Sequence, residues 1–232
     1  MPSSFETPFP EKTKKHAFER HDFETASHTN IRELPSRGDK IIRMEPMGDE
    51  GVDEALERIK TMKALYADIA AHGMSIPDFD VVIGKNERGK KSIISVVDKI
   101  EGERVSMIED HDPVLIDRLD EFFAAYLRYV ADARRERHAF YGDMSDLQLI
   151  YGHPKDETEK NVYLVDVGFN NFVWPDKEGA ATGRPGFNDQ VQMRIGFLMA
   201  AVENMQKRLP GAEFSKTGAA IEEIKRSFRN ET

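Results

Sequence analysis

The spacing of apolar residues changes along this chain, and the order of these changes limits what it can fold into. A period of three to four residues over 51–72 predicts an amphipathic helix. The neighbouring segments are instead short β-prone runs, Lys40–Met44 before the helix and Phe79–Gly84 and Ser92–Asp98 after it, and the polar stretch 85–91 predicts a hairpin turn between the last two. The first hundred residues therefore predict a small antiparallel sheet with one helix.

The second half of the chain is mainly helical by the same criterion. Apolar residues from Leu115 to Ala133 predict a long helix, those from Val191 to Met205 a second one, and Ile221–Phe228 a short last helix. Two short apolar runs, Leu147–Tyr151 and Val162–Val167, predict strands joined by a polar loop. Strands and helices are thus segregated, which predicts an α+β fold with two lobes rather than a doubly wound nucleotide-binding sheet.

The composition predicts a soluble globular protein, with 39% apolar and 32% charged residues. No apolar stretch approaches the ~18 residues that a transmembrane helix needs, and the N-terminal sequence has no apolar core typical of a secretory signal. We therefore expect a cytoplasmic protein without a membrane partner. The absence of cysteine excludes disulfides and thiolate-bound metals. The 33 Lys and Arg against 42 Asp and Glu give a net charge of −9, which argues against a nucleic-acid partner.

The chain divides into three expected regions. Residues 1–35, with prolines at 2, 8 and 10, predict an N-terminal tail with edge strands. Residues 36–100 form the expected N-lobe of sheet and one helix, and residues 103–232 form the mainly helical C-lobe. Gly102 marks the expected boundary between the two lobes.

Two acidic residues stand at the ends of the hairpin predicted in the C-lobe. Asp143 comes before it, in Gly142-Asp143, and Asp166 ends the second apolar run. Turn chemistry alone would explain an Asp at 143, whereas a charge next to an apolar run costs free energy if it is buried without a partner. Because a hairpin returns its two ends to one place, we expect the carboxylates to converge. They can then share one divalent cation, or one can act as a base while the other is a ligand.

At these residues the chain resembles the protein-kinase-like superfamily, including its aminoglycoside-phosphotransferase-like branch. In that family a helix leads to a loop with a base Asp and, five residues on, a metal-binding Asn. A hairpin then leads to Asp-x-Gly, whose Asp holds magnesium. The resemblance implies that Asp143 is the base, that Gln148 stands at the Asn position, and that Asp166, in Asp166-Val167-Gly168, is a magnesium ligand.

The resemblance also covers the first half of the chain, and it spans about residues 36–210 in all. The family's phosphate-binding Lys position falls on Arg43, with Lys40 as a nearby substitute. The resemblance implies Glu54 or Glu57 on the following helix as the ion-pair partner of that cation, and it places Glu101 in the hinge beside the nucleotide.

The departures from the family pattern leave more than one function open. No G-x-G-x-x-G motif is present to cover the phosphates, and Gln148 replaces the Asn. The first hypothesis is a divergent phosphotransferase that binds ATP and Mg²⁺ between its two lobes and phosphorylates an unknown acceptor. The second is a catalytically inactive, pseudokinase-like module that binds or scaffolds a protein partner. A metal-dependent hydrolase that uses the same two carboxylates is a third class.

Overall fold

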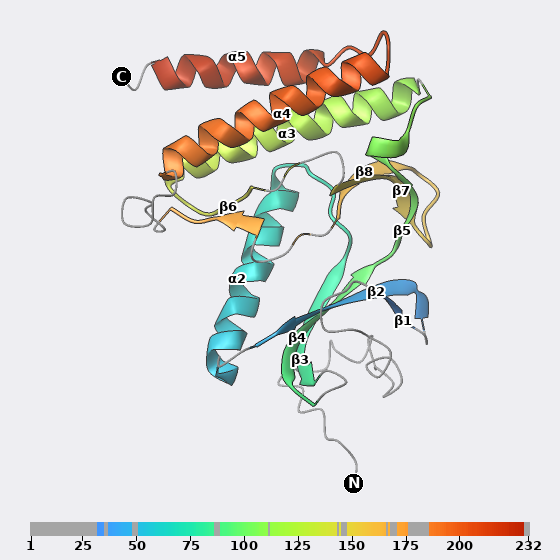
Figure 1. The fold of residues 1–232 in the computed structure, drawn as a ribbon, viewed down its shortest axis with the longest axis vertical. Coiled ribbons are helices and arrows are strands. Elements are labelled where there is room, and N and C mark those ends of the chain that lie inside the picture. Colours follow the sequence, from blue (N-terminus) through green and yellow to red (C-terminus); the bar gives the residue numbers. More distant parts are fainter. Residues whose placement is uncertain are drawn as a thin grey trace. The chain divides into compact units, whose positions relative to one another are not determined.

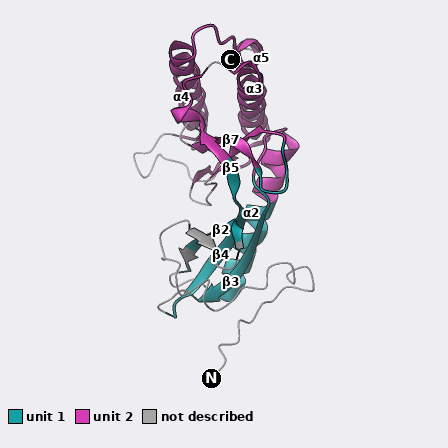
Figure 2. Cartoon of the chain, turned by 90° about the vertical axis from the view of Figure 1, so that its right-hand side faces the viewer, with its two compact units in different colours: residues 1–63, 77–101, 154–158 teal, residues 64–76, 102–153, 159–232 magenta. Residues whose placement is uncertain are grey.

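The structure is a computed structural model, and it describes residues 32–34, 37–47, 51–85, 89–110, 112–142, 144, 148–165, 167, 171–175 and 186–229. Within these ranges the chain is α+β, with four α-helices and three small β-sheets (Figure 1). The α+β class predicted from the segregated pattern is thus confirmed. The chain divides into two compact units (Figure 2): unit 1 comprises residues 1–63, 77–101 and 154–158, and unit 2 comprises residues 64–76, 102–153 and 159–232.

The first half of the chain contains β1 (Arg32–Leu34), β2 (Arg37–Pro46), α2 (Val52–Ala71), β3 (Phe79–Lys85), β4 (Lys91–Asp98) and β5 (Ile100–Arg104). The 3-10 helix η2 (Val105–Met107) leads into the second half, which contains α3 (Pro113–Glu136), β6 (Phe140–Tyr141), β7 (Leu149–Pro154), β8 (Asn161–Leu164), β9 (Phe172–Val173), α4 (Phe187–Arg208) and α5 (Ser215–Arg229). None of these helices is both long and apolar enough to cross a membrane.

Unit 1 is built on a four-stranded sheet with the order β1-β2-β4-β3. The central strand β4 pairs antiparallel with β2 and with β3, so that Ile94 lies opposite both Met44 and Val82. Apolar residues at alternate positions of these strands form a buried cluster on one face of the sheet, namely Ile42, Met44, Val82, Ile94 and Val96. The short strand β1 lies at the edge; the rest of the predicted tail, residues 1–31 and 35, is outside the described residues.

The first turns of α2 cover the opposite face of this sheet. The buried cluster on that face consists of Met47, Ala55, Ile59, Val81 and Ile93. The helix begins next to Gly51, whose N–H donates to Glu54 Oε2 at 2.9 Å. This bond satisfies one of the amide groups that a helix leaves unpaired at its N-terminus.

In unit 2, α3 packs between β6, β8 and the two C-terminal helices (Figure 1). The helix starts at Pro113 after Asp112, whose Oδ1 accepts the N–H of Val114 at 2.9 Å. Asp120 of α3 is buried and holds the start of α5. Its two carboxylate oxygens accept the N–H groups of Lys216 (2.8 Å) and Thr217 (2.7 Å), and the Thr217 hydroxyl donates to it as well.

The last two turns of α2 and the residues after it belong to unit 2, where polar groups join them to α3 and the residues that follow it. His72 Nε2 lies 3.3 Å from Asp132 Oδ2, and His138 Nε2 lies 3.3 Å from Asp68 Oδ2. The sequence places all of 36–100 in one lobe, whereas 64–76 lies in unit 2 and 154–158 in unit 1. Near the expected boundary, the chain passes from unit 1 to unit 2 between residues 101 and 102.

Candidate functional site

Two tyrosines of α3 hold the backbone that leads to the predicted base. The Tyr126 hydroxyl donates to the carbonyl oxygen of Tyr141 at 3.0 Å, and the N–H of Tyr141 donates to Tyr129 Oη at 2.9 Å. Burial raises the pKa of Tyr129 above its ordinary value; the hydrogen bond from Tyr141 lowers it in part, and the charge of Asp68 raises it further. The Tyr129 hydroxyl therefore stays neutral at physiological pH.

Gly142 lies where no side chain would fit. Its N–H donates to the carbonyl oxygen of Asn171 at 2.9 Å, which extends the pairing of β6 with β9 by one residue. A Cβ atom at Gly142 would lie 2.5 Å from Val173 Cγ2 and 3.4 Å from Arg194 Nε. The glycine of the Gly142-Asp143 dipeptide is thus required by close packing. Asp143 lies outside the described residues.

β7 and β8 form the hairpin that the sequence predicts. Leu149 pairs with Leu164, and the N–H of Val165 donates to the carbonyl oxygen of Gln148 at 2.9 Å. Gln148, the residue at the predicted metal-binding position, is half-buried next to the backbone that precedes Asp166. Asp166 itself lies outside the described residues.

Helix α2 reaches the same region through Tyr66. Its hydroxyl donates to the carbonyl oxygen of Val167, the middle residue of the Asp-x-Gly motif. Ser75, just beyond the helix, accepts the N–H of Leu164 at 2.9 Å through its carbonyl oxygen. In the sequence, Tyr66 and Tyr126 fall at apolar positions of their helical patterns, and nothing local marks their hydroxyl groups. The available signal is that a buried tyrosine hydroxyl needs a hydrogen-bond partner.

The register of unit 1 separates the two candidate phosphate-binding cations. Arg43 lies opposite Ser95, which lies opposite Val81, so Arg43 is on the face covered by α2. Lys40 is on the other face, where it lies opposite Asp98 and forms an ion pair with it. The charge of Lys40 is thus already compensated within the sheet.

The acidic residues that the resemblance implies in unit 1, Glu54, Glu57 and Glu101, are all exposed. Glu57 is 71% exposed and pairs with Lys60 in the next turn of α2, at 2.5 Å, and Glu54 accepts the N–H of Gly51. Glu101 is exposed on β5. Among the described residues, neither Glu54 nor Glu57 forms an ion pair with Arg43, because both project from the exposed side of α2.

Within the described ranges, no group of three or more His, Asp and Glu side chains is arranged to hold a metal ion. Of the two predicted metal ligands, Gln148 is among the described residues and Asp166 is not. No protein-family model matches the chain, and no curated protein is significantly similar to it in sequence. A function must accordingly be argued from the residues and their arrangement.

Proposed function

We propose that the chain is a divergent kinase-like phosphotransferase that uses ATP and Mg²⁺. One observation carries the proposal: two backbone hydrogen bonds of unit 2 bracket both acidic loops. Gly142 is bonded to Asn171 and Gln148 to Val165, each at 2.9 Å. The segments 143–147 and 166–170 therefore begin and end at the same two backbone contacts.

Chain connectivity brings the acidic residues close to these contacts. Asp143 directly follows Gly142, and Asp166 directly follows Val165. Consecutive Cα atoms are about 3.8 Å apart, so each acidic residue starts one step from a fixed backbone hydrogen bond. Support from Tyr126, Tyr129 and Tyr66 on the flanking backbone favours a site that is fixed in advance, which a phosphoryl transfer requires.

In the proposed reaction, the oxygen of an acceptor hydroxyl attacks the γ-phosphorus of ATP. The bond from that phosphorus to the bridging oxygen breaks, ADP leaves, and the hydroxyl proton passes to Asp143. Asp166 and the side-chain carbonyl of Gln148 would hold Mg²⁺, since carboxylate and amide oxygens suit this ion. When bound, Mg²⁺ supplies positive charge that neutralises the phosphates. The resemblance implies Arg43 or Lys40 as the phosphate contact, and of these Lys40 forms an ion pair with Asp98.

A specific observation favours the pseudokinase-like alternative. The carboxylates of Glu54 and Glu57 are engaged within α2, so the implied ion pair with the phosphate-binding cation is not formed. A chain with this arrangement can retain nucleotide binding and lack efficient transfer. The alternative therefore predicts binding of a nucleotide or a protein partner without release of ADP.

The two readings are tested by thermal unfolding of the wild type and Asp166→Asn with ATP, with and without Mg²⁺ or Mn²⁺. At about 100 times its dissociation constant, a ligand stabilises the folded state by about 2.7 kcal/mol. We expect a metal-dependent shift that is lost in Asp166→Asn and kept in Asp156→Asn, a matched change in the exposed β7–β8 loop. The absence of any shift at millimolar ATP would contradict the phosphotransferase and leave a binding module.

A further inference from the structure

Arg194 of α4 lies beside Gly142. Its Nε is buried and forms no hydrogen bond with a described residue. The nitrogen lies 3.4 Å from the position that a Cβ atom of Gly142 would take. The contact made by its guanidinium group is with an aromatic ring, since its central carbon lies 5.9 Å from the centre of Phe197.

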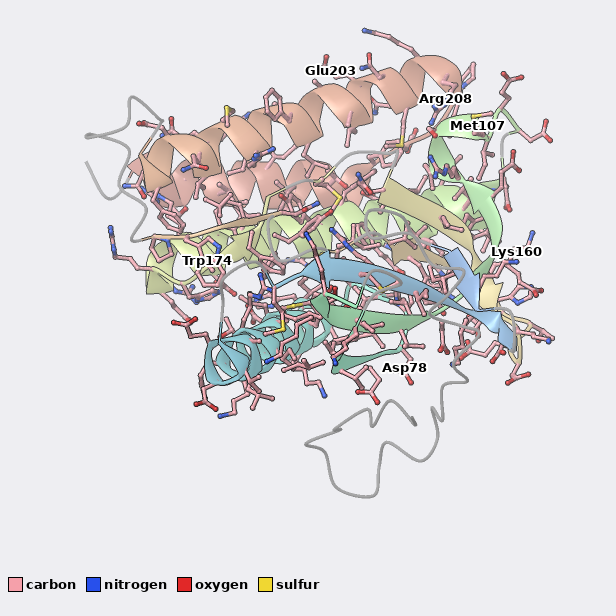
Figure 3. The ribbon with its side chains drawn as sticks, turned by 60° about the horizontal axis from the view of Figure 1, so that its bottom comes forward. Asp78, Met107, Lys160, Trp174, Glu203 and Arg208 are labelled. Carbon is pink, nitrogen blue, oxygen red and sulfur yellow. The ribbon has the colours of Figure 1, made fainter. Side chains whose placement is uncertain are left out.

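Two other arginines of unit 2 donate to acceptors through their terminal guanidinium nitrogens. Arg208, at the end of α4, donates to the carbonyl oxygens of Ser106 (2.7 Å) and Val105 (2.9 Å), and Figure 3 shows it next to Met107 of η2. Arg118 donates to Glu159 at 2.6 Å. Within the described part of the chain, Arg208 Nε is buried without an acceptor, as Arg194 Nε is, but the terminal nitrogens of Arg208 are bonded. Arg194 Nε has no acceptor among the described residues, and the guanidinium group of Arg194 contacts the ring of Phe197.

The surroundings of Arg194 suit a ligand with an anionic group and an apolar part. A guanidinium group offers a planar fork of N–H donors that matches a carboxylate or a phosphate. Phe197 is 53% exposed and Met193 is 36% exposed, and they lie one turn apart on the same side of α4. Because the chain carries a net charge of −9, general electrostatic attraction does not draw an anion to it. A local cation such as Arg194 is then needed to bind one.

We propose that Arg194 recognises the phosphate acceptor by binding an anionic group, a carboxylate or a phosphate, of an alcohol whose apolar part lies against Phe197. The inference rests on the proposed function, because Gly142 directly precedes Asp143, the proposed base. It narrows the acceptor to hydroxy acids and phosphorylated alcohols. Arg194 thereby sets the specificity of the reaction.

The test measures acceptor binding without nucleotide, by ligand-observed saturation-transfer NMR. The probes are glycerate and glycerol 2-phosphate, each compared with glycerol, and 3-phenyllactate compared with the corresponding neutral diol. We expect the anionic probes to bind and the neutral ones not to. Arg194→Met should weaken that binding by about tenfold or more, since it removes hydrogen bonds to a charged group. Lys207→Met removes the same charge from an exposed position of α4 and should leave binding unchanged.

Arg194→Lys keeps the charge but loses the planar fork, and it should also weaken binding; it carries the test if Arg194→Met fails to fold. Equal binding of anionic and neutral probes, no binding of any probe, or wild-type affinity in both variants would overturn the proposal.

The ATP-dependent stabilisation of the same variants separates the role of Arg194 in acceptor binding from the proposed phosphotransferase activity. An unchanged ATP response supports the acceptor role, and its loss in Arg194→Met contradicts it. If wild type binds the anions but not ATP, the proposed phosphotransferase fails while the anion site stands.

Discussion

Two glycines of unit 2, Gly142 and Gly196, differ in the space around them, so the same substitution by alanine should change stability in opposite directions. A Cβ atom at Gly142 would lie 2.5 Å from Val173, whereas one at Gly196, in the middle of α4, would meet nothing within 4 Å. We expect Gly142→Ala to lower the free energy of unfolding by about 1–3 kcal/mol, because the β6–β9 pair must shift. Gly196→Ala should raise it by about 0.5–1 kcal/mol, because alanine favours a helix interior.

Denaturant unfolding measures both values, and the ATP-dependent thermal shift shows whether the effect reaches the site. Gly142→Ala should reduce that shift, because the displaced backbone carries Asp143. If Gly142→Ala proved as stable as wild type with an unchanged ATP response, Gly142 would not be packed as the structure describes.

For the candidate site, the sequence alone indicates residue types better than their orientations. The Gly142-Asp143 and Asp166-Val167-Gly168 motifs supply the candidate acidic residues, but the face of the sheet on which Lys40 and Arg43 lie needs the strand register. A shift of one residue in that register exchanges the two faces of a strand, and no local pattern fixes it. Arg194 was not predicted either, because its neighbour Gly142 is distant in the sequence and only the tertiary fold brings them together.

At the scale of elements, the start of α5 depends on one buried carboxylate of α3. Asp120 accepts both the N–H groups of Lys216 and Thr217 and the Thr217 hydroxyl. Replacing it with alanine leaves these donors without their acceptor, so we expect Asp120→Ala to lower the free energy of unfolding by about 2–4 kcal/mol.

Asp117 provides the matched control for this prediction. It also contacts Lys216, at 2.6 Å, but the pair is exposed, and exposed ion pairs contribute little to the free energy of unfolding. Chemical denaturation of Asp117→Ala and Asp120→Ala compares the two directly. A loss at Asp120 no larger than at Asp117 would contradict a role of the buried carboxylate in holding α5.

Tyr129 connects α3 to β6 through its hydrogen bond with Tyr141, and its burial predicts how the stability of the protein depends on pH. Burial raises its pKa in the folded state above the ordinary value of 10.0. The unfolded chain therefore loses this proton first as the pH rises, and the stability contributed by the neutral hydroxyl decreases above about pH 10. We expect Tyr129→Phe to be less stable than wild type at pH 7 but to lose stability less steeply between about pH 10 and 12. Equal slopes in urea unfolding over this range would contradict the burial of an un-ionised hydroxyl.

Helices and strands in which apolar residues recur at a regular spacing were predictable from the sequence. Those whose bounds depend on contacts with other elements were not. α2, α3, β3 and β4 lie where their patterns indicate. β5 was missed because only Ile100 of its residues is buried, so it shows no alternation. The sequence suggests a last helix at 221–228, whereas α5 starts at Ser215 because Asp120 of another helix satisfies its first amide groups.

At the scale of the whole molecule, the division into units differs in part from the expected lobes. The helical period of α2 is continuous, so the sequence offers no sign that its last turns belong with α3. Within unit 2, Asp68 contacts His138 and His72 contacts Asp132, and these contacts join residues far apart in the chain. The α+β class follows from the order of apolar patterns, while the membership of each unit follows from tertiary contacts.

The central claim is that the loops after Gly142 and Val165 together provide a divalent-metal and nucleotide site. Titrating Mn²⁺ in the presence of ATP, and following free Mn²⁺ by electron paramagnetic resonance, tests it most directly. Wild type and Asp156→Asn should deplete the free-ion signal beyond what ATP alone does. Asp166→Asn should lose this effect, whereas Asp143→Asn, which changes the proposed base, should keep most of it. Binding by Asp166→Asn equal to that of wild type, or no binding by wild type, would contradict the account.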